Sequence, residues 1–354
     1  MSGPGAGAGT SDEFAGKVVL VTGGGKGVGR AIVREFTARG AHVVINYFHS
    51  ARSARATQQE VEAAGGSCEL IRGSVAKPDD VTAMFDAVRQ RAGRLDVLVN
   101  NAARGVLAPA NTLTDVTWQK VFDVNVHGAR RCAWAALPLL AETGGSVVNV
   151  SSIGAGMVIA NYTVVGVSKA ALEALSRYLA VEFAPYGVRV NVASSGFLDS
   201  PTATRFPGSD TLRANNVVST PLGRLGTEQE LAGLVAVLAS PRTGWVTGQV
   251  VLADGGISLG NALFRPDPPR PATARPPRPP GPGEKIPAAD RTPSRGPRTP
   301  ARRPDARGTT STSSTTPPGA MTTPPGPSAN GTVAEGAPPV DPAGPRPQDV
   351  TGTP

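Results

Sequence analysis

Short apolar runs alternate with amphipathic stretches from residue 17 to residue 256. The runs are rich in valine, leucine and isoleucine, and most are continuously apolar, as expected for strands covered on both faces. Between them, stretches such as 28–40 and 79–93 have the periodicity of amphipathic helices. This alternation predicts an α/β protein with a doubly wound parallel sheet and helices on both faces. The predicted strands are 17–23, 42–47, 68–75, 95–102, 145–152, 188–196 and 248–256.

Composition changes sharply near residue 263. Of the 34 prolines, 25 lie in residues 265–354, where aromatic and β-branched aliphatic residues are almost absent. Such a segment cannot bury enough apolar surface to offset its ordering entropy. We therefore expect a flexible lead (1–14), one domain (15–262) and a disordered tail (263–354) that is dispensable for folding and turnover.

Charge and cysteine usage exclude several classes of function. The chain carries a formal net charge of +8, but residues 265–354 hold 12 Lys and Arg against 7 Asp and Glu, so the predicted domain is nearly balanced. Nucleic acid is therefore not an expected partner. The two cysteines and three histidines show no metal-binding spacing. Because no apolar run reaches the roughly 18 residues of a membrane span, we expect a cytoplasmic protein.

A glycine-rich stretch, "TGGGKGVG" (22–29), joins the first predicted strand to the first helix. Gly23, Gly27 and Gly29 allow a sharp turn and a close approach of the backbone to a pyrophosphate. The helix that continues through Val28 presents its N-terminal N–H groups to that phosphate. The stretch predicts a Rossmann-type dinucleotide site.

The end of the second strand indicates which dinucleotide binds. An acidic residue about 20 positions after the glycines usually holds a free ribose hydroxyl, but here Tyr47 and Ser50 occupy that region. Lys26 and Arg52 can neutralise a 2′-phosphate. We therefore expect NADPH.

Five segments together resemble the short-chain dehydrogenase/reductase family. They occur in order as "TGGGKGVG" (22–29), "NNAA" (100–103), "FDVNVHG" (122–128), "VVNVSSIGA" (147–155) and "TGQVVLADGG" (247–256). The stretch "NYTVVGVSKAALEALSRYLAVEFAP" is more closely similar to the third type of bacterial enoyl-acyl-carrier-protein reductase. That branch uses NADPH, and its catalytic tyrosine precedes the lysine by seven residues.

The resemblance implies four catalytic residues. Tyr162 would donate a hydrogen bond or proton to an enolate oxygen, and Ser152 would also contact the carbonyl. Lys169 would hold the nicotinamide ribose and lower the tyrosine pKa. Asn125 would hold a helix distortion near the lysine. Further cofactor contacts would come from Asn101, Ala102, Ser74, Val75, Gly196, Leu198 and Ser200. Ser74 and Ser195 depart from the family's usual Asp-Val and Pro-Gly pairs.

The longer spacing suits enoyl reduction. Residues seven apart on a helix lie within about 20° of one face and about 10 Å apart along the axis, against about 6 Å for a spacing of four. The acid is thereby moved away from the lysine. Hydride addition to an enoyl thioester places charge on an oxygen distant from the β-carbon, so a displaced Tyr162 fits. Val165, at the usual tyrosine position, would then form a wall of the site.

The sequence is compatible with three functions. The first is reduction of an enoyl thioester carried by acyl carrier protein or coenzyme A. The second is a 3-oxoacyl or other carbonyl reductase. The third is a non-catalytic nucleotide-binding module. The resemblance also implies a dimer or tetramer formed through helices beginning near Thr112 and Val165.

Overall fold

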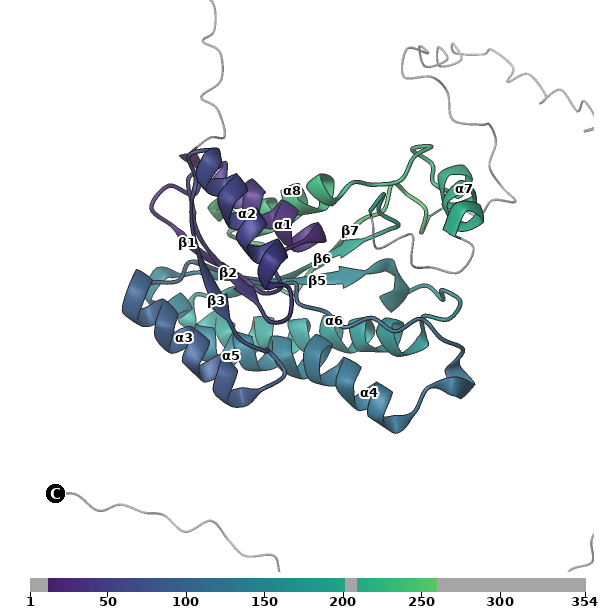
Figure 1. Ribbon diagram of the computed structural model, residues 1–354, viewed down its shortest axis with the longest axis horizontal. Coiled ribbons are helices and arrows are strands. Elements are labelled where there is room, and N and C mark those ends of the chain that lie inside the picture. Colours follow the sequence, from purple (N-terminus) through teal and green to yellow (C-terminus); the bar gives the residue numbers. More distant parts are fainter. Residues whose placement is uncertain (1–11, 201–208, 260–354) are drawn as a thin grey trace, which may run out of the picture. The chain divides into compact units, whose positions relative to one another are not determined.

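Seven parallel strands form one sheet in the order β3-β2-β1-β4-β5-β6-β7 (Figure 1). The chain thus starts in the middle of the sheet, runs to one edge and returns to build the other half, as the doubly wound prediction requires. The computed structural model describes residues 12–200 and 209–259. These residues belong to the first of two compact units, Met1–Pro277. The predicted tail lies outside the described residues.

The strands are β1 (Val18–Val21), β2 (His42–Tyr47), β3 (Ser67–Arg72), β4 (Val97–Asn100), β5 (Ser146–Ser152), β6 (Arg189–Ser195) and β7 (Val250–Ala253). Several are shorter than predicted. For example, Asn101 and Ala102 follow β4, because the backbone N–H groups of both bind the side chain of Thr22 and leave the ladder.

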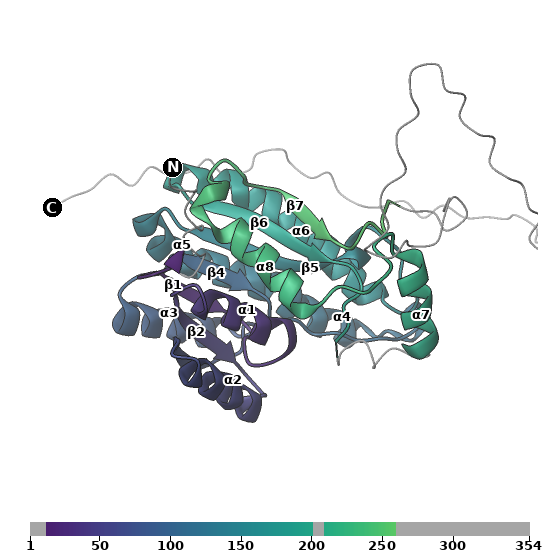
Figure 2. The ribbon, with the colours of Figure 1, turned by 90° about the horizontal axis from the view of Figure 1, so that it is seen from above.

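Helices cover both faces of the sheet (Figures 1 and 2). One face packs against α1 (Gly27–Thr37), α2 (Ala51–Ala63) and α8 (Glu228–Ala239). The other packs against α3 (Pro78–Ala92), α5 (Ala129–Thr143) and α6 (Thr163–Phe183). Successive residues alternate between the two cores: Val19 and Val21 face α1, whereas Val18 and Leu20 face α3 and α5. Both faces are therefore apolar, which explains the continuous hydrophobic runs.

Two predicted helix starts were displaced. The helix expected from Thr112 begins as α4 (Asp115–Phe122), where Thr114 caps it by accepting a hydrogen bond from the Thr117 N–H. The helix expected from Val165 begins at Thr163 as α6. The remaining helix, α7 (Ser209–Ser219), follows residues 201–208, which lie outside the described residues.

Candidate active site

The predicted phosphate loop connects β1 to α1, and its three glycines are required for different reasons. Gly23 and Gly27 have φ of +64° and +57°, in the left-handed region that other residues rarely adopt. Gly29 has ordinary dihedrals, but a Cβ there would lie 2.3 Å from the Gly23 carbonyl oxygen and 2.6 Å from the Asn101 side chain. A side chain would therefore be strained at Gly23 and Gly27 and would clash at Gly29.

The N-terminus of α1 is open to an anion. Lys26 is the N-cap residue, yet its side chain makes no capping hydrogen bond, and the first turn holds no acidic side chain. The first N–H groups of a helix have no partner within the helix and carry partial positive charge. Together with Val28 and the glycines, this end of α1 fits the pyrophosphate of a dinucleotide.

Two polar side chains hold this loop in place, the predicted Asn101 and Asn46, which was not predicted. Asn46 is buried in β2. Its Oδ1 accepts a hydrogen bond from the Gly23 N–H at 3.4 Å, and its Nδ2 donates to the Gly73 carbonyl at 3.0 Å. The amide of Asn101 donates to the carbonyls of Thr22 and Gly23. The signal for Asn46 was a polar residue inside the apolar run "HVVINY".

Cations collect where β2 ends. Tyr47 is half-buried, while Lys26 and Arg52 are exposed. Ser50 is the N-cap of α2 and makes no side-chain capping bond there. The cationic groups of Arg72 and Lys77 lie 5.6 and 5.9 Å from the Phe48 ring centroid. Arg72 and Lys77 were not predicted as part of this positive region.

One carboxylate faces the phosphate loop and was not predicted. Glu228 begins α8, which packs against α1, and its Oε1 lies 3.6 Å from where a Gly27 Cβ would stand. Burial raises the pKa of Glu228, and nearby Arg30 opposes that effect. Glu228 is distant in sequence from the loop, so only the packing of α8 on α1 reveals it.

The remaining expected cofactor contacts lie in loops at the carboxyl ends of the strands. The Ser74 N–H binds the Asp80 carboxylate at 2.8 Å, and Val75 is buried. The Gly196 N–H binds the Ala253 carbonyl, and Leu198 forms a bridge with Gly226. Ser200 is the last described residue before the gap at 201–208 and is half-buried.

Tyr162 is the N-cap residue of α6 and lies just outside the helix. The seven-residue spacing therefore starts one residue before the helix and not within it. Asn161 precedes the tyrosine with φ of +61°, the only positive φ of a non-glycine residue in the described segments. The tyrosine ring packs over Gly154, where a Cβ would lie 2.6 Å from the ring. The turn at Asn161 and the missing side chain at Gly154 thus direct the ring.

Ser152 meets the tyrosine at the end of β5. Its Oγ accepts a hydrogen bond from the Gly154 N–H at 3.2 Å, and its side chain also hydrogen-bonds Tyr162. Burial raises the pKa of Tyr162, and the bond to Ser152 lowers it by a smaller amount. The expected net lowering of this pKa was wrong, because desolvation of the phenol dominates. The hydroxyl is a proton donor at neutral pH.

Lys169 is buried in the second turn of α6. Its Nζ donates a hydrogen bond to the Val150 carbonyl at 2.7 Å, two residues before Ser152. Burial lowers the pKa of Lys169 to about 8, with Glu173 acting in the opposite direction. The ammonium group therefore lies against β5, two residues before Ser152 along the strand.

Asn125 lies in a π-helical segment, Asp123–Gly128, between α4 and α5. The predicted helix distortion is confirmed at this position. The buried Asn125 side chain accepts a hydrogen bond from the Arg104 N–H at 2.8 Å and donates to the Ser168 hydroxyl at 2.9 Å. It thereby connects the loop after β4 to the helix that carries Lys169. Such bulges are frequent at functional sites.

Val165 is buried, as expected for a wall of the site. It belongs to a small apolar cluster in which the Tyr162 ring also packs. The phenol hydroxyl therefore lies next to apolar side chains on one side and Ser152 on the other. The other members of the cluster are Val106, Leu113, Trp118, Val121 and Val164.

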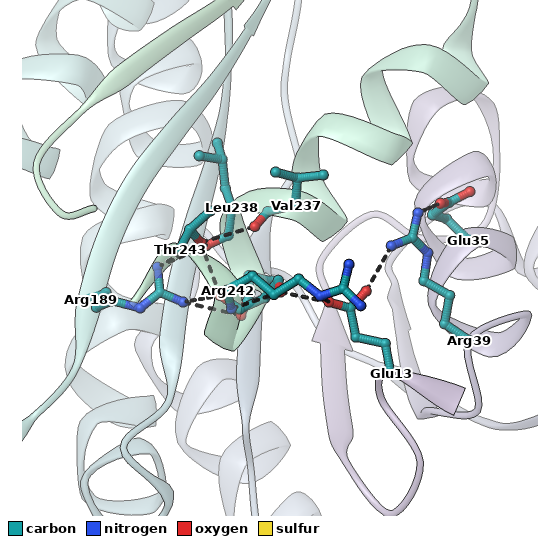
Figure 3. Close-up of polar contacts among 10 residues, drawn as sticks. Glu13, Glu35, Arg39, Arg189, Val237, Leu238, Arg242 and Thr243 are labelled. Carbon is teal, nitrogen blue, oxygen red and sulfur yellow. Dashed lines mark hydrogen bonds and ion pairs between the residues drawn. The ribbon is translucent and has the colours of Figure 1, made fainter. Parts of the chain in front are cut away.

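A cavity of about 340 Å³ lies at the amino ends of the strands, whereas the candidate active site lies at their carboxyl ends. Two residues that line the cavity, Glu13 and Arg189, belong to a network of polar contacts (Figure 3). Arg189 binds the last carbonyls of α8, including Leu238 at 2.9 Å, while Glu13 pairs with Arg39 and Arg242. None of the predicted site residues lines this cavity, so it is separate from the candidate active site.

Comparison with known proteins agrees with this geometry. The chain matches the family model described as Enoyl-(Acyl carrier protein) reductase over residues 23–258. An uncharacterized oxidoreductase of Methylorubrum extorquens is 40% identical over 246 residues, 69% of this chain and 99% of that protein. The 1-cyclohexenylcarbonyl-CoA reductase of Streptomyces collinus is 37% identical over 264 residues, 72% of this chain and 94% of that enzyme. A 3-oxoacyl-[acyl-carrier-protein] reductase of Staphylococcus aureus is 34% identical over 248 residues, 69% and 98% of the two chains.

The seven-stranded parallel sheet and the family match define an oxidoreductase of a class that typically binds a nicotinamide cofactor. The chain belongs to the short-chain dehydrogenase/reductase family. Among the described residues, no helix is long and apolar enough to cross a membrane. The same residues include no group of three His, Cys, Asp or Glu side chains suited to a metal ion.

Proposed function

We propose that the protein reduces the carbon–carbon double bond of an enoyl thioester with NADPH, on acyl carrier protein or coenzyme A. The observation that carries this proposal is the placement of the acid. Tyr162 stands at the start of α6, seven residues before Lys169, while the buried Val165 fills the position four residues before it. The similarity to an enoyl-type family model and to an enoyl-CoA reductase supports it.

The side chains present have the chemistry for this reaction. NADPH, when bound, supplies a hydride to the β-carbon, and negative charge develops on the thioester oxygen. Tyr162 remains protonated at neutral pH because burial raises its pKa, so its hydroxyl can donate to that oxygen. The Ser152 hydroxyl can stabilise the same charge. Lys169, one helical turn inside α6, can reach the nicotinamide ribose from the Val150 carbonyl that it now binds.

Reduction of a carbonyl is the second candidate. The Ser152–Tyr162 hydrogen bond can also present a proton to a ketone oxygen, and a 3-oxoacyl reductase is among the relatives. The two candidates differ in the oxygen that must be reached. Consumption of NADPH with crotonyl-CoA against acetoacetyl-CoA separates them, and turnover of the acetoacetyl thioester alone would favour the second candidate. Binding of NADPH without turnover of either would leave a nucleotide-binding module.

The role of Tyr162 is tested by Tyr162→Phe, which keeps the ring over Gly154 and removes the hydroxyl. Loss of an oxyanion donor typically lowers kcat by about 10²–10³, with NADPH affinity little changed. Tyr186→Phe is the matched control, because Tyr186 is 55% exposed in the turn that follows the same helix. Adding Val165→Tyr to Tyr162→Phe should not restore enoyl reduction. Full enoyl activity in Tyr162→Phe would remove Tyr162 from the mechanism.

The preference for NADPH is proposed from the charges around the end of β2. Lys26 and Arg52 are exposed there, and Arg72 and Lys77 flank Phe48. A 2′-phosphate would enter a positive environment. Tyr47→Asp should weaken NADPH binding by charge repulsion and improve NADH relative to it. Equal kcat/KM for NADPH and NADH in the wild-type protein would overturn the preference.

Association of two or four copies is proposed from exposed apolar side chains on α5 and α6. Trp134, Tyr178 and Val181 are 45%, 71% and 75% exposed. Other apolar side chains of α6, Leu179 and Phe183, pack inside the core and are not part of this exposed surface. Sedimentation at several concentrations tests the proposal, and a monomer mass at all of them would contradict it.

A further inference from the structure

Two side chains of α6 bind neighbouring residues of β5. Lys169 donates a hydrogen bond from Nζ to the Val150 carbonyl at 2.7 Å. Glu173 lies one turn later and accepts a hydrogen bond from the Ser151 hydroxyl at 2.6 Å. Residues four apart on a helix lie on the same face. The lysine and the glutamate therefore form adjacent contacts to the strand that ends in Ser152.

The surroundings of Lys169 are otherwise uncharged. Tyr162 and Ser152 offer hydroxyl groups, and the π-helical segment packed against α6 presents Asn125 to the neighbouring Ser168. Among the residues that the structure describes, Glu173 is the charged side chain whose field acts on Lys169, and it raises the lysine pKa against the effect of burial. A buried ammonium group without such a partner would be strongly disfavoured.

The simpler role for Glu173 is to hold α6 against β5 through its hydrogen bond with Ser151. A neutral side chain of the same shape, such as glutamine, could still accept the Ser151 hydrogen bond, although more weakly than a carboxylate. Only a carboxylate can act on the charge of Lys169 through its field. The two roles are therefore separable by replacing the charge and keeping the shape.

We propose that Glu173 is a positioning residue that keeps Lys169 charged and directed to the carboxyl end of β5, where the nicotinamide ribose would bind. This inference rests on the proposed function in one respect, the ribose as the ligand of Lys169. The electrostatic pairing itself can be tested without any ligand.

A double-mutant cycle tests the pairing through stability. The variants are Lys169→Met, Glu173→Gln and the double variant, and urea unfolding is followed at pH 7 and pH 9.5. Lys169 is charged in the folded protein at the lower pH and largely neutral at the higher one, because its pKa is about 8. A favourable coupling at pH 7 that is lost at pH 9.5 is expected. Equal coupling at both values, or none at pH 7, would overturn the proposal.

The control is Glu182→Gln, which removes an exposed carboxylate from the same helix. It should show no coupling to Lys169→Met at either pH. Coupling as large as that of Glu173 would mean that net charge alone is responsible. Ser151→Ala removes the hydrogen bond between Ser151 and Glu173 but keeps the carboxylate. In this background, the coupling between Lys169→Met and Glu173→Gln should be retained. If the coupling between Lys169 and Glu173 disappeared in the Ser151→Ala background, the Ser151–Glu173 hydrogen bond, and not the charge of Glu173, would be responsible for it.

Cofactor binding provides a separate test. The affinity for NADPH should fall as Lys169 loses its proton, and this fall should begin at lower pH in Glu173→Gln but not in Glu182→Gln. Coupling in the unfolding cycle without NADPH binding would count against the proposed function and leave the pairing intact. NADPH binding with a fall at the same pH in both variants would overturn the positioning role.

Discussion

Replacing Lys169 by methionine should make the stability difference from the wild type depend strongly on pH. Lys169 is buried beneath β5, and burial lowers its pKa from the ordinary 10.5 to about 8. In the unfolded chain the same group keeps its proton up to about pH 10.4. Between these two values the unfolded state binds more protons than the folded state. Wild-type stability therefore rises relative to Lys169→Met as pH increases through that window.

The size of the effect follows from the two pKa values. Below pH 8 both states carry the proton, and the folded state bears the full penalty of a buried charge. Taking each tenfold change in protonation as about 1.4 kcal/mol, the wild type gains about 1.4 kcal/mol by pH 9 and about 2.5 kcal/mol by pH 10. Above pH 10.5 the gain levels off near 3 kcal/mol. Methionine is unbranched and fills a similar space, so its packing term does not change with pH.

Urea unfolding of both proteins at pH 7, 8, 9 and 10 measures this difference. Other titrating groups contribute equally to both proteins and cancel. Lys120→Met is the matched control, because Lys120 lies exposed on α4, and its difference from wild type should stay flat. A constant difference between wild type and Lys169→Met from pH 7 to pH 10 would refute the reasoning. It would mean that Lys169 keeps its proton in the folded protein.

Three further predictions concern residues that position the site. Gly154→Ala should lower kcat on the order of 10²-fold by moving the Tyr162 ring, with NADPH affinity unchanged by fluorescence titration; unchanged kcat would contradict the contact. Glu228→Gln should tighten NADPH binding about fivefold at low salt, with less effect at high salt; unchanged affinity would place this carboxylate outside the phosphate site. Asn161→Val should lower the free energy of unfolding by about 1–2 kcal/mol because of its positive φ, whereas Asn161→Gly should not; equal losses in urea unfolding would rule out backbone strain.

The fold was predictable because the central strands carry apolar runs that only a sheet covered on both faces can accommodate. Val18 to Val21 face the two cores alternately, so their continuous hydrophobicity encodes burial on both sides. The glycine loop was predictable for a similar reason, since Gly23 and Gly27 have positive φ and there is no room for a Cβ at Gly29. These features are local, and local features are what a single sequence states directly.

Contacts between distant segments were not predictable in the same way. Glu228 meets Gly27 across some 200 residues only because α8 packs against α1. Asn46 was hidden because a polar residue in an apolar run carries no information about its partners, which here lie in the loop after β1 and beyond the end of β3. The pKa values depend on how deeply each group is buried, and the sequence pattern predicts which segments are buried but not the burial of a single side chain. Desolvation therefore reversed the expected direction for Tyr162.

The placement of Tyr162 depends on a turn and not on the geometry of a continuous helix. Helical geometry was used to bring Tyr162 and Lys169 to one face, but the tyrosine lies before the helix, with its carbonyl accepting the first α6 hydrogen bond from the Gly166 N–H at 2.8 Å. Its ring direction is set instead by the left-handed turn at Asn161 and by the open space over Gly154. The seven-residue spacing therefore specifies a turn followed by two helical turns. A substitution that straightens this turn should displace the hydroxyl even though Tyr162, Ser152 and Lys169 are all retained.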